Sequence, residues 1–233
     1  MTLHQLSCLS SVIGAFCYLV GDILIVGFNL EPEKYSLLSK TYKEKIIHPI
    51  LSYYMLKGTS KRLMWGAIFG MIGTPFLFGS LYMQHVLFIN LPSFLYYSAI
   101  SLSVISSSVS ALAHASFFFV AELYKLIYKC DASSHEEILK TGNLFTKMLF
   151  TAWYPAVFCG LISNFILIIS LFCKNSLLPQ WAVLFNPIIV YFLFKISRPY
   201  FPKILKEYLA GAAFNVASIV GQTLISLLVW NHK

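Results

Sequence analysis

Charged side chains are scarce in this sequence: Asp, Glu, Lys and Arg together make up only 11% of its 233 residues. A soluble globular domain contains about 25% charged residues, so the shortage argues against an ordinary water-soluble protein. Hydrophobic residues, by contrast, make up 58% of the chain. The composition therefore indicates an integral membrane protein, in which lipid surrounds most of the apolar surface.

Short motifs of common enzyme classes are also missing. There is no G-x-S-x-G nucleophile elbow, no H-E-x-x-H metal motif and no glycine-rich phosphate loop. The five cysteines show no disulfide framework, and no Cys/His spacing is typical of a zinc site. Lysine and arginine avoid the middle of the apolar runs, which argues against a retinal Schiff base and a voltage sensor. The sequence thus predicts no cofactor, no metal site and no catalytic residue.

Apolar runs long enough to cross a bilayer recur along the chain. A spanning helix needs about 20 mostly apolar residues. Six runs meet this requirement: 6–28, 62–88, 92–128, 144–173, 177–196 and 202–230. The first run has no basic residue before it and no small-residue cleavage site after it, so we expect a span and not a signal peptide. Because the runs are continuous and not alternating, the predicted fold is all-α, a transmembrane bundle of six helices in a single domain, 1–233.

The net charge of +8 is distributed unevenly along the chain. Fifteen of the 17 basic residues lie in or beside the first, third and fifth connections, and Lys174 and Lys233 are the other two. Basic residues favour the cytoplasmic side of a membrane. We therefore expect connections 29–61, 129–143 and 197–202 to be cytoplasmic and both termini to face outward. The basic loops would contact membrane lipids, and no nucleic-acid partner is expected.

Two of these connections contain helix signals. Segment 29–61 mixes charges with Leu, Ile and Tyr, which predicts a short amphipathic helix on the inner membrane surface. In segment 129–143, Ser133 or Ser134 precedes two glutamates, which indicates the start of a helix.

Small residues and prolines mark where the predicted spans should pack or bend. Small residues recur at close-packing spacing in two spans, at Gly66, Gly70 and Gly73 and at Ala213, Ala217 and Gly221. Pro75 lies inside the second span and Pro187 inside the fifth, where we expect ordinary kinks. The alternative is a pair of interrupted helices at matching places of two halves, which can flank a transporter site.

Polar residues follow one face of three predicted spans. These residues are Ser11, Tyr18 and Asp22 in the first span, Ser103, Ser107, Ser110 and His114 in the third, and Gly211, Asn215, Ser218 and Gln222 in the sixth. An unpaired charge facing lipid costs about 3 kcal/mol or more, so we expect the three faces to point at one another.

Asp22 and His114 are predicted to form a carboxylate–imidazole pair in the inner half of the membrane, with the carboxylate orienting the ring. The predicted ligand-binding residues are Asp22, His114, Asn215, Ser110, Ser107 and Tyr18. A hydrogen-bonded network that only holds helices together is the alternative. Glu122 lies one turn from Lys125, and both are expected to reach the inner headgroups.

Short motifs over most of the chain resemble those of a known family. They are Gly21-Asp22 in the first span, Ser60, Arg62, Leu63, Gly66, Ala67 and Gly70 at the second, His114 in the third, Pro179, Trp181, Asn186 and Pro187 at the fifth, and 211–215 in the sixth. The family is a group of uncharacterised bacterial integral-membrane proteins, the domain of unknown function DUF6796. The resemblance implies a six-helix fold in a bacterial inner membrane and brings no established activity; segment 29–61 is not covered by these motifs.

Three functions are compatible with these residues. The first is binding or transport of a lipid-like or small amphipathic ligand in a polar cavity bounded by the first, third and sixth spans. The second is an intramembrane enzyme that uses Asp22 and His114 as acid and base. The third is a structural or assembly protein without a site, whose polar residues satisfy one another. The oligomeric state is left open.

Overall fold

The computed structural model describes residues 1–231, and these residues form helices and connecting segments without a β-strand. The α-helices are α1 (Leu3–Val26), α2 (Pro49–Leu56), α3 (Ser60–Gly79), α4 (Leu81–Phe88), α5 (Ser93–Leu126), α6 (His135–Phe172), α7 (Pro187–Ser197), α8 (Lys203–Tyr208) and α9 (Ala213–Val229). Short 3₁₀ or π turns cover Pro32–Tyr35, Leu37–Thr41, Lys43–Lys45, Ala132–Ser134, Gln180–Phe185 and Arg198–Tyr200. The all-α prediction is confirmed for this part of the chain.

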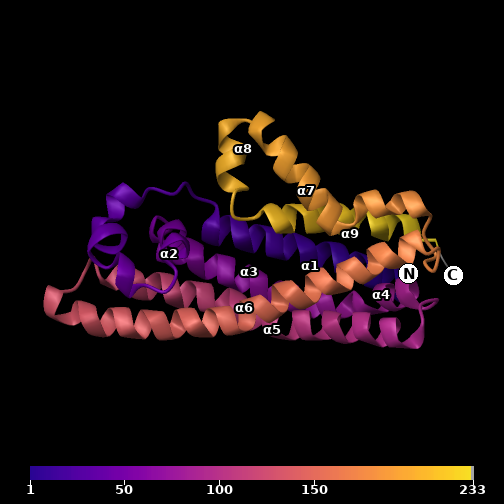
Figure 1. Ribbon diagram of the computed structural model, residues 1–233, viewed down its shortest axis with the longest axis horizontal. Helices are drawn as coiled ribbons and strands as arrows, with labels where there is room; N and C mark the ends of the chain where they lie inside the picture. Colours follow the sequence, from indigo (N-terminus) through magenta and orange to yellow (C-terminus); the bar gives the residue numbers. More distant parts are fainter. Residues whose placement is uncertain (232–233) are drawn as a thin grey trace.

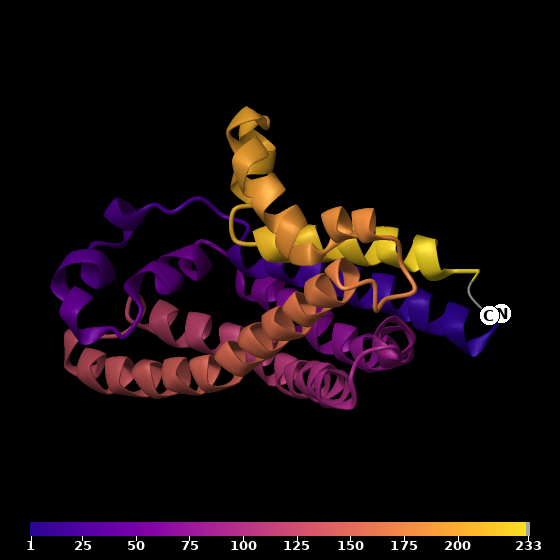
Figure 2. The same ribbon diagram turned by 45° about the vertical axis from the view of Figure 1, so that its right-hand side comes forward.

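Most of the long helices run along one axis of the molecule. In Figure 1, α1, α3, α5 and α6 extend along the long axis, and α9 lies beside α1. The start of α1 and the end of α9 lie at one end of the bundle, while α2 and the connection between α5 and α6 lie at the other. Helices α7 and α8 project sideways from the bundle, which is also clear in the turned view of Figure 2.

Three single helices in the described chain are long and apolar enough to cross a membrane: α1, α5 and the helix containing α6. A fourth crossing is possible for α3 and α4 together, which meet at a bend of 41°. The bend lies at Ser80 and not at Pro75. There, the Ser7 hydroxyl donates to the Gly79 carbonyl at 2.7 Å and accepts from the Met83 N–H at 2.8 Å. Ser7 thus satisfies two backbone groups at the break.

The segments predicted as the fifth and sixth spans are each divided. Pro187 begins α7 and does not kink a continuous helix, because the preceding Asn186 ends the 3₁₀ turn and caps α7. The buried Asn186 side chain accepts from the Ile188 N–H at 2.9 Å and donates to the Asn164 carbonyl of α6 at 2.9 Å. Helix α7 has only 11 residues. The sixth predicted span is divided into the short helix α8 and the 17-residue helix α9.

Two of the connections predicted from the sequence contain helical structure. Segment 29–61 contains short turns and the eight-residue helix α2, whose Tyr53, Met55 and Leu56 are buried against the bundle. In segment 129–143, α6 begins at His135, after Ser134 and with two glutamates in its first turn. This confirms the predicted helix start and shortens the connection between α5 and α6.

Helices α5 and α6 are longer than a bilayer crossing requires. They contain 34 and 38 residues, which correspond to about 51 and 57 Å of helix, whereas the hydrocarbon layer is about 30 Å thick. Each of these two helices is therefore long enough for one membrane crossing with several turns to spare.

Two hydrophobic clusters occupy the two ends of the bundle. One cluster, at the end with α2, includes Leu38, Met55, Tyr124 and Leu149. The other, near the termini, includes Met83, Phe88, Leu171 and Val229. Each draws side chains from four or more segments that are distant in sequence, so the clusters close the bundle at both ends.

Glycines bring α1 and α3 into close contact. A Cβ atom on Gly66 would lie 2.6 Å from Cγ1 of Ile25 and 2.9 Å from the Gly21 carbonyl oxygen. A Cβ atom on Gly21 would in turn lie 3.0 Å from the Gly66 carbonyl oxygen. Backbone atoms cannot move aside as a flexible side chain can, so both positions need glycine. The close packing predicted at Gly66 is therefore present.

We expect Gly66→Ala to lower the free energy of unfolding by about 1–3 kcal/mol, because the added methyl group overpacks the contact between α1 and α3. Thermal unfolding of the purified protein in detergent would measure the loss. Gly160→Ala is the matched control, since its Cβ would meet only the Ser106 side chain, at 3.1 Å. Equal effects of the two substitutions would contradict this account of the α1–α3 contact.

Candidate functional site

A cavity of about 930 Å³ lies between the two hydrophobic clusters. Its walls come mainly from α1, α4, α5, α6, α7 and α9. All six residues predicted to bind a ligand line it, namely Asp22, His114, Asn215, Ser110, Ser107 and Tyr18. The three polar faces predicted from the sequence therefore do meet around one space. Their role in ligand binding stays a prediction.

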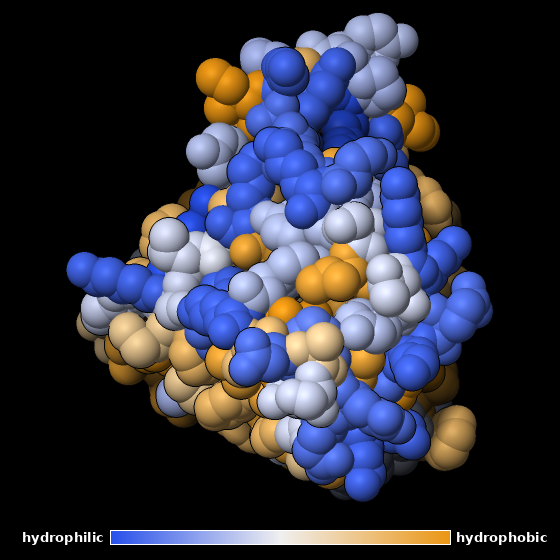
Figure 3. All heavy atoms as spheres, turned by 90° about the vertical axis from the view of Figure 1, so that its left-hand side faces the viewer, coloured by the Kyte–Doolittle hydropathy of each residue, from blue (hydrophilic) through white to orange (hydrophobic). Residues whose placement is uncertain are grey.

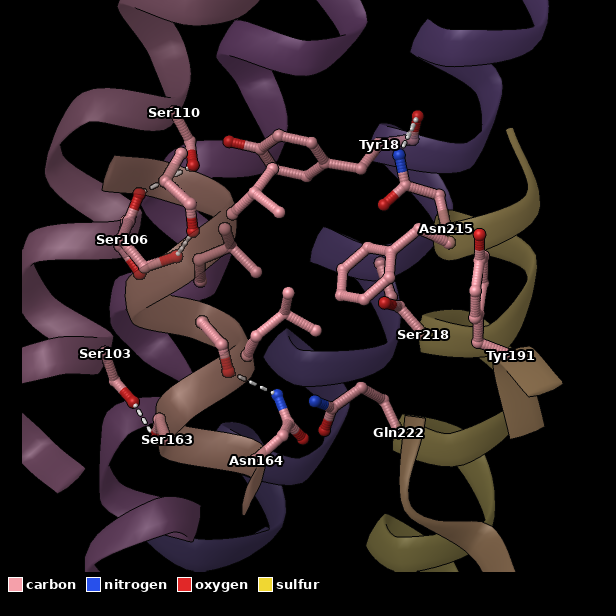
Figure 4. Close-up of a pocket in the computed structure, with 18 of the residues that line it drawn as sticks. Tyr18, Ser103, Ser106, Ser110, Ser163, Asn164, Tyr191, Asn215, Ser218 and Gln222 are labelled. Carbon is pink, nitrogen blue, oxygen red and sulfur yellow. Dashed lines mark hydrogen bonds between the residues drawn. The ribbon is translucent and has the colours of Figure 1, made fainter. Parts of the chain in front are cut away.

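The serines of α5 form the first polar wall. Ser103, Ser107 and Ser110 are buried and line the cavity at helical spacing. Ser103 exchanges a hydrogen bond of 2.8 Å with Ser163 of α6, and Ser106 donates to the Ala156 carbonyl at 2.6 Å. Figure 4 shows Ser103, Ser106 and Ser110 on one side of the cavity. The hydroxyls thus join α5 to α6 and also give this wall a polar surface.

Asp22, His114 and Asn215 form the second polar group. The Asn215 amide donates to Oδ2 of Asp22 at 2.6 Å, and Nε2 of His114 lies 3.4 Å from Oδ1. The carboxylate of α1 thus contacts α5 and α9 at the same time. Both of its oxygens face a polar partner, which is the condition for keeping a carboxylate at low exposure.

The two ring nitrogens of His114 have different neighbours. Its Nδ1 lies 3.2 Å from the Ser110 carbonyl oxygen, which can only accept a hydrogen bond. Nδ1 must therefore donate to this carbonyl. Nε2 lies 3.4 Å from Oδ1 of Asp22, and this contact is not a hydrogen bond of good geometry.

The position of His114 depends on neighbouring residues of α1 and α3. The Tyr18 ring meets the imidazole edge-on, with 4.5 Å between ring centroids. On the other side, a Cβ atom on Gly70 would collide with the imidazole. The Tyr18 hydroxyl bonds to Thr74 at 2.8 Å. The ring of His114 is thereby confined between two helices, and Asp22 lies within its reach.

A third polar group lies on α9 and α6. Figure 4 shows the side chains of Asn164 and Gln222 turned toward one another across the cavity, with Ser218 on the same side as Gln222. Ser11 of α1 donates to the Gln222 side chain at 2.7 Å. Asn164 was not among the predicted site residues. A lone amide in the apolar stretch LISNFI was the signal in the sequence that could have found it.

Glu122 and Arg62 lie outside the cavity. Glu122 accepts from Lys125 at 2.9 Å and from Ser60, the first residue of α3, at 2.8 Å. Arg62 donates to the Ile23 carbonyl at 2.7 Å, at the C-terminal end of α1, and its guanidinium lies 3.8 Å from the Phe28 ring centroid. Each charge favours the helix end that it touches, so both residues stabilise the junction of α1, α3 and α5.

Ser110 and His114 do not form a catalytic dyad in this geometry. The Ser110 hydroxyl donates to the Ser106 carbonyl at 2.6 Å, and the imidazole contacts the Ser110 backbone and not its hydroxyl. No group of three or more metal-ligating side chains occurs among the described residues.

These features define an all-helical protein with several apolar helices of membrane-spanning length and a polar cavity between its helices. The chain belongs to the Family of unknown function (DUF6796), whose model matches residues 3–233. The resemblance predicted from short motifs is thus confirmed over nearly the whole chain. No curated protein and no solved structure matches the chain.

The contact between Asp22 and His114 can be measured with a double-mutant cycle. We expect Asp22→Asn and His114→Ala each to reduce stability, and the two changes together to show a coupling of about 0.5–3 kcal/mol, because the carboxylate and the imidazole are in contact at low exposure. Thermal or denaturant unfolding in detergent measures each variant. The exposed pair Glu137 and Lys140, whose charged atoms are 3.9 Å apart, serves as the control and should show no measurable coupling. Additive losses at Asp22 and His114 would refute their direct interaction.

Proposed function

We propose that this protein binds or transports a lipid-like or small amphipathic molecule in the cavity between α1, α5, α6, α7 and α9. One observation carries the proposal: a cavity of about 930 Å³ combines apolar walls with hydroxyl, amide and carboxylate groups. Ligand pockets in proteins have volumes of about 300–1,000 Å³ and the same mixture of apolar lining with a few polar groups. A scaffold without a ligand would gain nothing from leaving this volume unfilled.

The proposed route into the cavity is sideways from the membrane. Ile162 and Phe165 of α6 and Phe192 of α7 all line the cavity, and each is about half exposed on the outer surface. Helix α7 rises away from the bundle beyond this point (Figure 2). An amphiphile dissolved in lipid could therefore pass between α6 and α7 with its chain in contact with apolar side chains throughout.

We place the protein in the inner membrane of a bacterial cell, with six crossings or partial crossings. In this orientation both termini lie outside, and the end that carries α2 lies in the cytoplasm. Hydrophilic residues gather on the end that carries α2, as Figure 3 shows, and the clustering of basic residues in the first and third connections supports this direction. The projecting α7–α8 segment carries Lys195, Arg198, Lys203 and Lys206 beside exposed apolar side chains. This combination suits the boundary between lipid and water.

The enzyme hypothesis receives less support from the site. The imidazole of His114 is confined by Tyr18 and Gly70, and its Nε2 faces Asp22. A general base needs a free nitrogen within hydrogen-bond reach of the substrate. The geometry therefore suits Asp22 and His114 better as a fixed polar wall of the cavity than as an acid–base pair.

Native mass spectrometry of the detergent-purified protein tests the binding function. We expect a co-purifying amphiphile in the wild type and loss of most of it in Ser218→Trp, because Ser218 points into the cavity and the indole would fill it. The matched control is Ser108→Trp on the exposed face of α5, which should retain the ligand. Asp22→Asn and His114→Ala should also reduce retention.

A different result would favour the scaffold hypothesis. If no form of the protein retains a small molecule, and Asp22→Asn and His114→Ala lower only the thermal unfolding temperature, the polar residues serve to hold the helices together. Equal loss of ligand in Ser108→Trp and Ser218→Trp would show that binding occurs on the outer surface and not in the cavity.

A further inference from the structure

We infer that the ligand of this cavity has an uncharged polar group that carries hydroxyls, and that phosphate-bearing lipids do not bind inside it. The inference rests on the proposed binding function and narrows it to one chemical class. Its basis is the charge and the hydrogen-bonding capacity of the side chains that line the cavity.

Positive charge is missing from the cavity wall. Among the described residues that line the cavity there is no lysine and no arginine. Arg62 bonds to backbone carbonyls of α1, and Lys125 is paired with Glu122, so neither of these two cations is directed to the cavity. Transfer of a phosphate group from water into such a space would leave its charge without a partner, which is costly in an apolar environment.

Lys195 lies close to the rim of the cavity. Its Nζ is 5.4 Å from the centroid of the Tyr191 ring, and Tyr191 lines the cavity. The lysine itself is exposed and does not contribute to the wall. A phosphate attracted to Lys195 would therefore stay at the surface, where water and lipid headgroups surround it.

The negative charge in the wall already has its partners. Oδ1 of Asp22 faces His114, and Oδ2 accepts a hydrogen bond from Asn215. Both oxygens of Asp22 are therefore already in contact with a side chain of the wall, and a cationic headgroup would have to displace one of these contacts. An anionic headgroup finds no cationic side chain of lysine or arginine in the wall.

The remaining polar surface consists of hydroxyls and amides. Ser218, Gln222 and Asn164 point into the space in Figure 4, and Ser107 lines it from α5. Hydroxyls and amides both donate and accept hydrogen bonds. A ligand hydroxyl has the same dual capacity, so a small number of hydroxyls on an apolar chain matches this wall, as in a monoacylglycerol.

The test compares two lipids that differ only in phosphate: monooleoylglycerol and oleoyl lysophosphatidate. The measured quantity is the rise in thermal unfolding temperature of the detergent-purified protein as each lipid is added. We expect monooleoylglycerol to bind the wild type at least about ten times more tightly, a difference of about 1.4 kcal/mol. Lys195→Ala should keep this preference, because the lysine is outside the cavity.

A charge introduced into the cavity should reverse the preference. We expect Ser218→Lys to bind oleoyl lysophosphatidate more tightly than monooleoylglycerol, because the ammonium group supplies the missing counter-charge. Ser218→Met is the matched control, with an uncharged side chain of similar length, and should not favour the phosphate. Ser218→Trp should abolish the effect of both lipids.

The outcomes separate this inference from the proposed function. If wild-type protein binds oleoyl lysophosphatidate as tightly as monooleoylglycerol, and Ser218→Trp abolishes both, the predicted ligand class is wrong and the binding function stands. If neither lipid binds and no ligand co-purifies, both are wrong. The chemistry of a co-purified ligand that Ser218→Trp displaces also tests the inference. A charged headgroup on this ligand overturns the inference, and an uncharged headgroup supports it.

Discussion

Where α1 crosses α3, Gly21, Gly66 and Gly70 leave no space for a Cβ atom, and the arrangement around the cavity depends on this contact. It lets His114 of α5 pack directly against α3, within 3.4 Å of the Asp22 carboxylate on α1. A bulkier residue at Gly70 would displace the imidazole and leave the carboxylate with fewer partners. Close backbone packing therefore makes it possible to keep an acidic side chain inside an apolar bundle.

The cavity follows from the way the rest of the chain is distributed. Hydrophobic clusters close the bundle at its two ends, and between them α6 and α9 face each other across hydroxyl and amide side chains. Asn186 contributes by ending one helical turn, starting α7 and bonding to α6. Helix α7 then projects away from the bundle, and its Phe192 both lines the cavity and is exposed on the surface.

The sequence predicted the polar residues of the site but not all of their partners. Tyr18, Asp22, Ser107, Ser110, His114 and Asn215 share helical faces, and helical periodicity was sufficient to bring them to one cavity. Asn164 was missed, because a single amide in an apolar run has no periodic neighbours. Predicted spans 177–196 and 202–230 are divided in the structure, since hydropathy measures the length of an apolar stretch and does not register that Asn186 caps a new helix.

Composition and helical periodicity by themselves determined the all-α class, the apolar membrane character and the polar face of each helix, because these depend only on residue type and on 3.6 residues per turn. The tertiary structure decided which faces meet, where the helices break and that a cavity remains between the two clusters. These properties depend on contacts between residues that are far apart in the sequence. For example, the packing of α1 against α9 brings the Asn215 side-chain nitrogen within 2.6 Å of Oδ2 of Asp22.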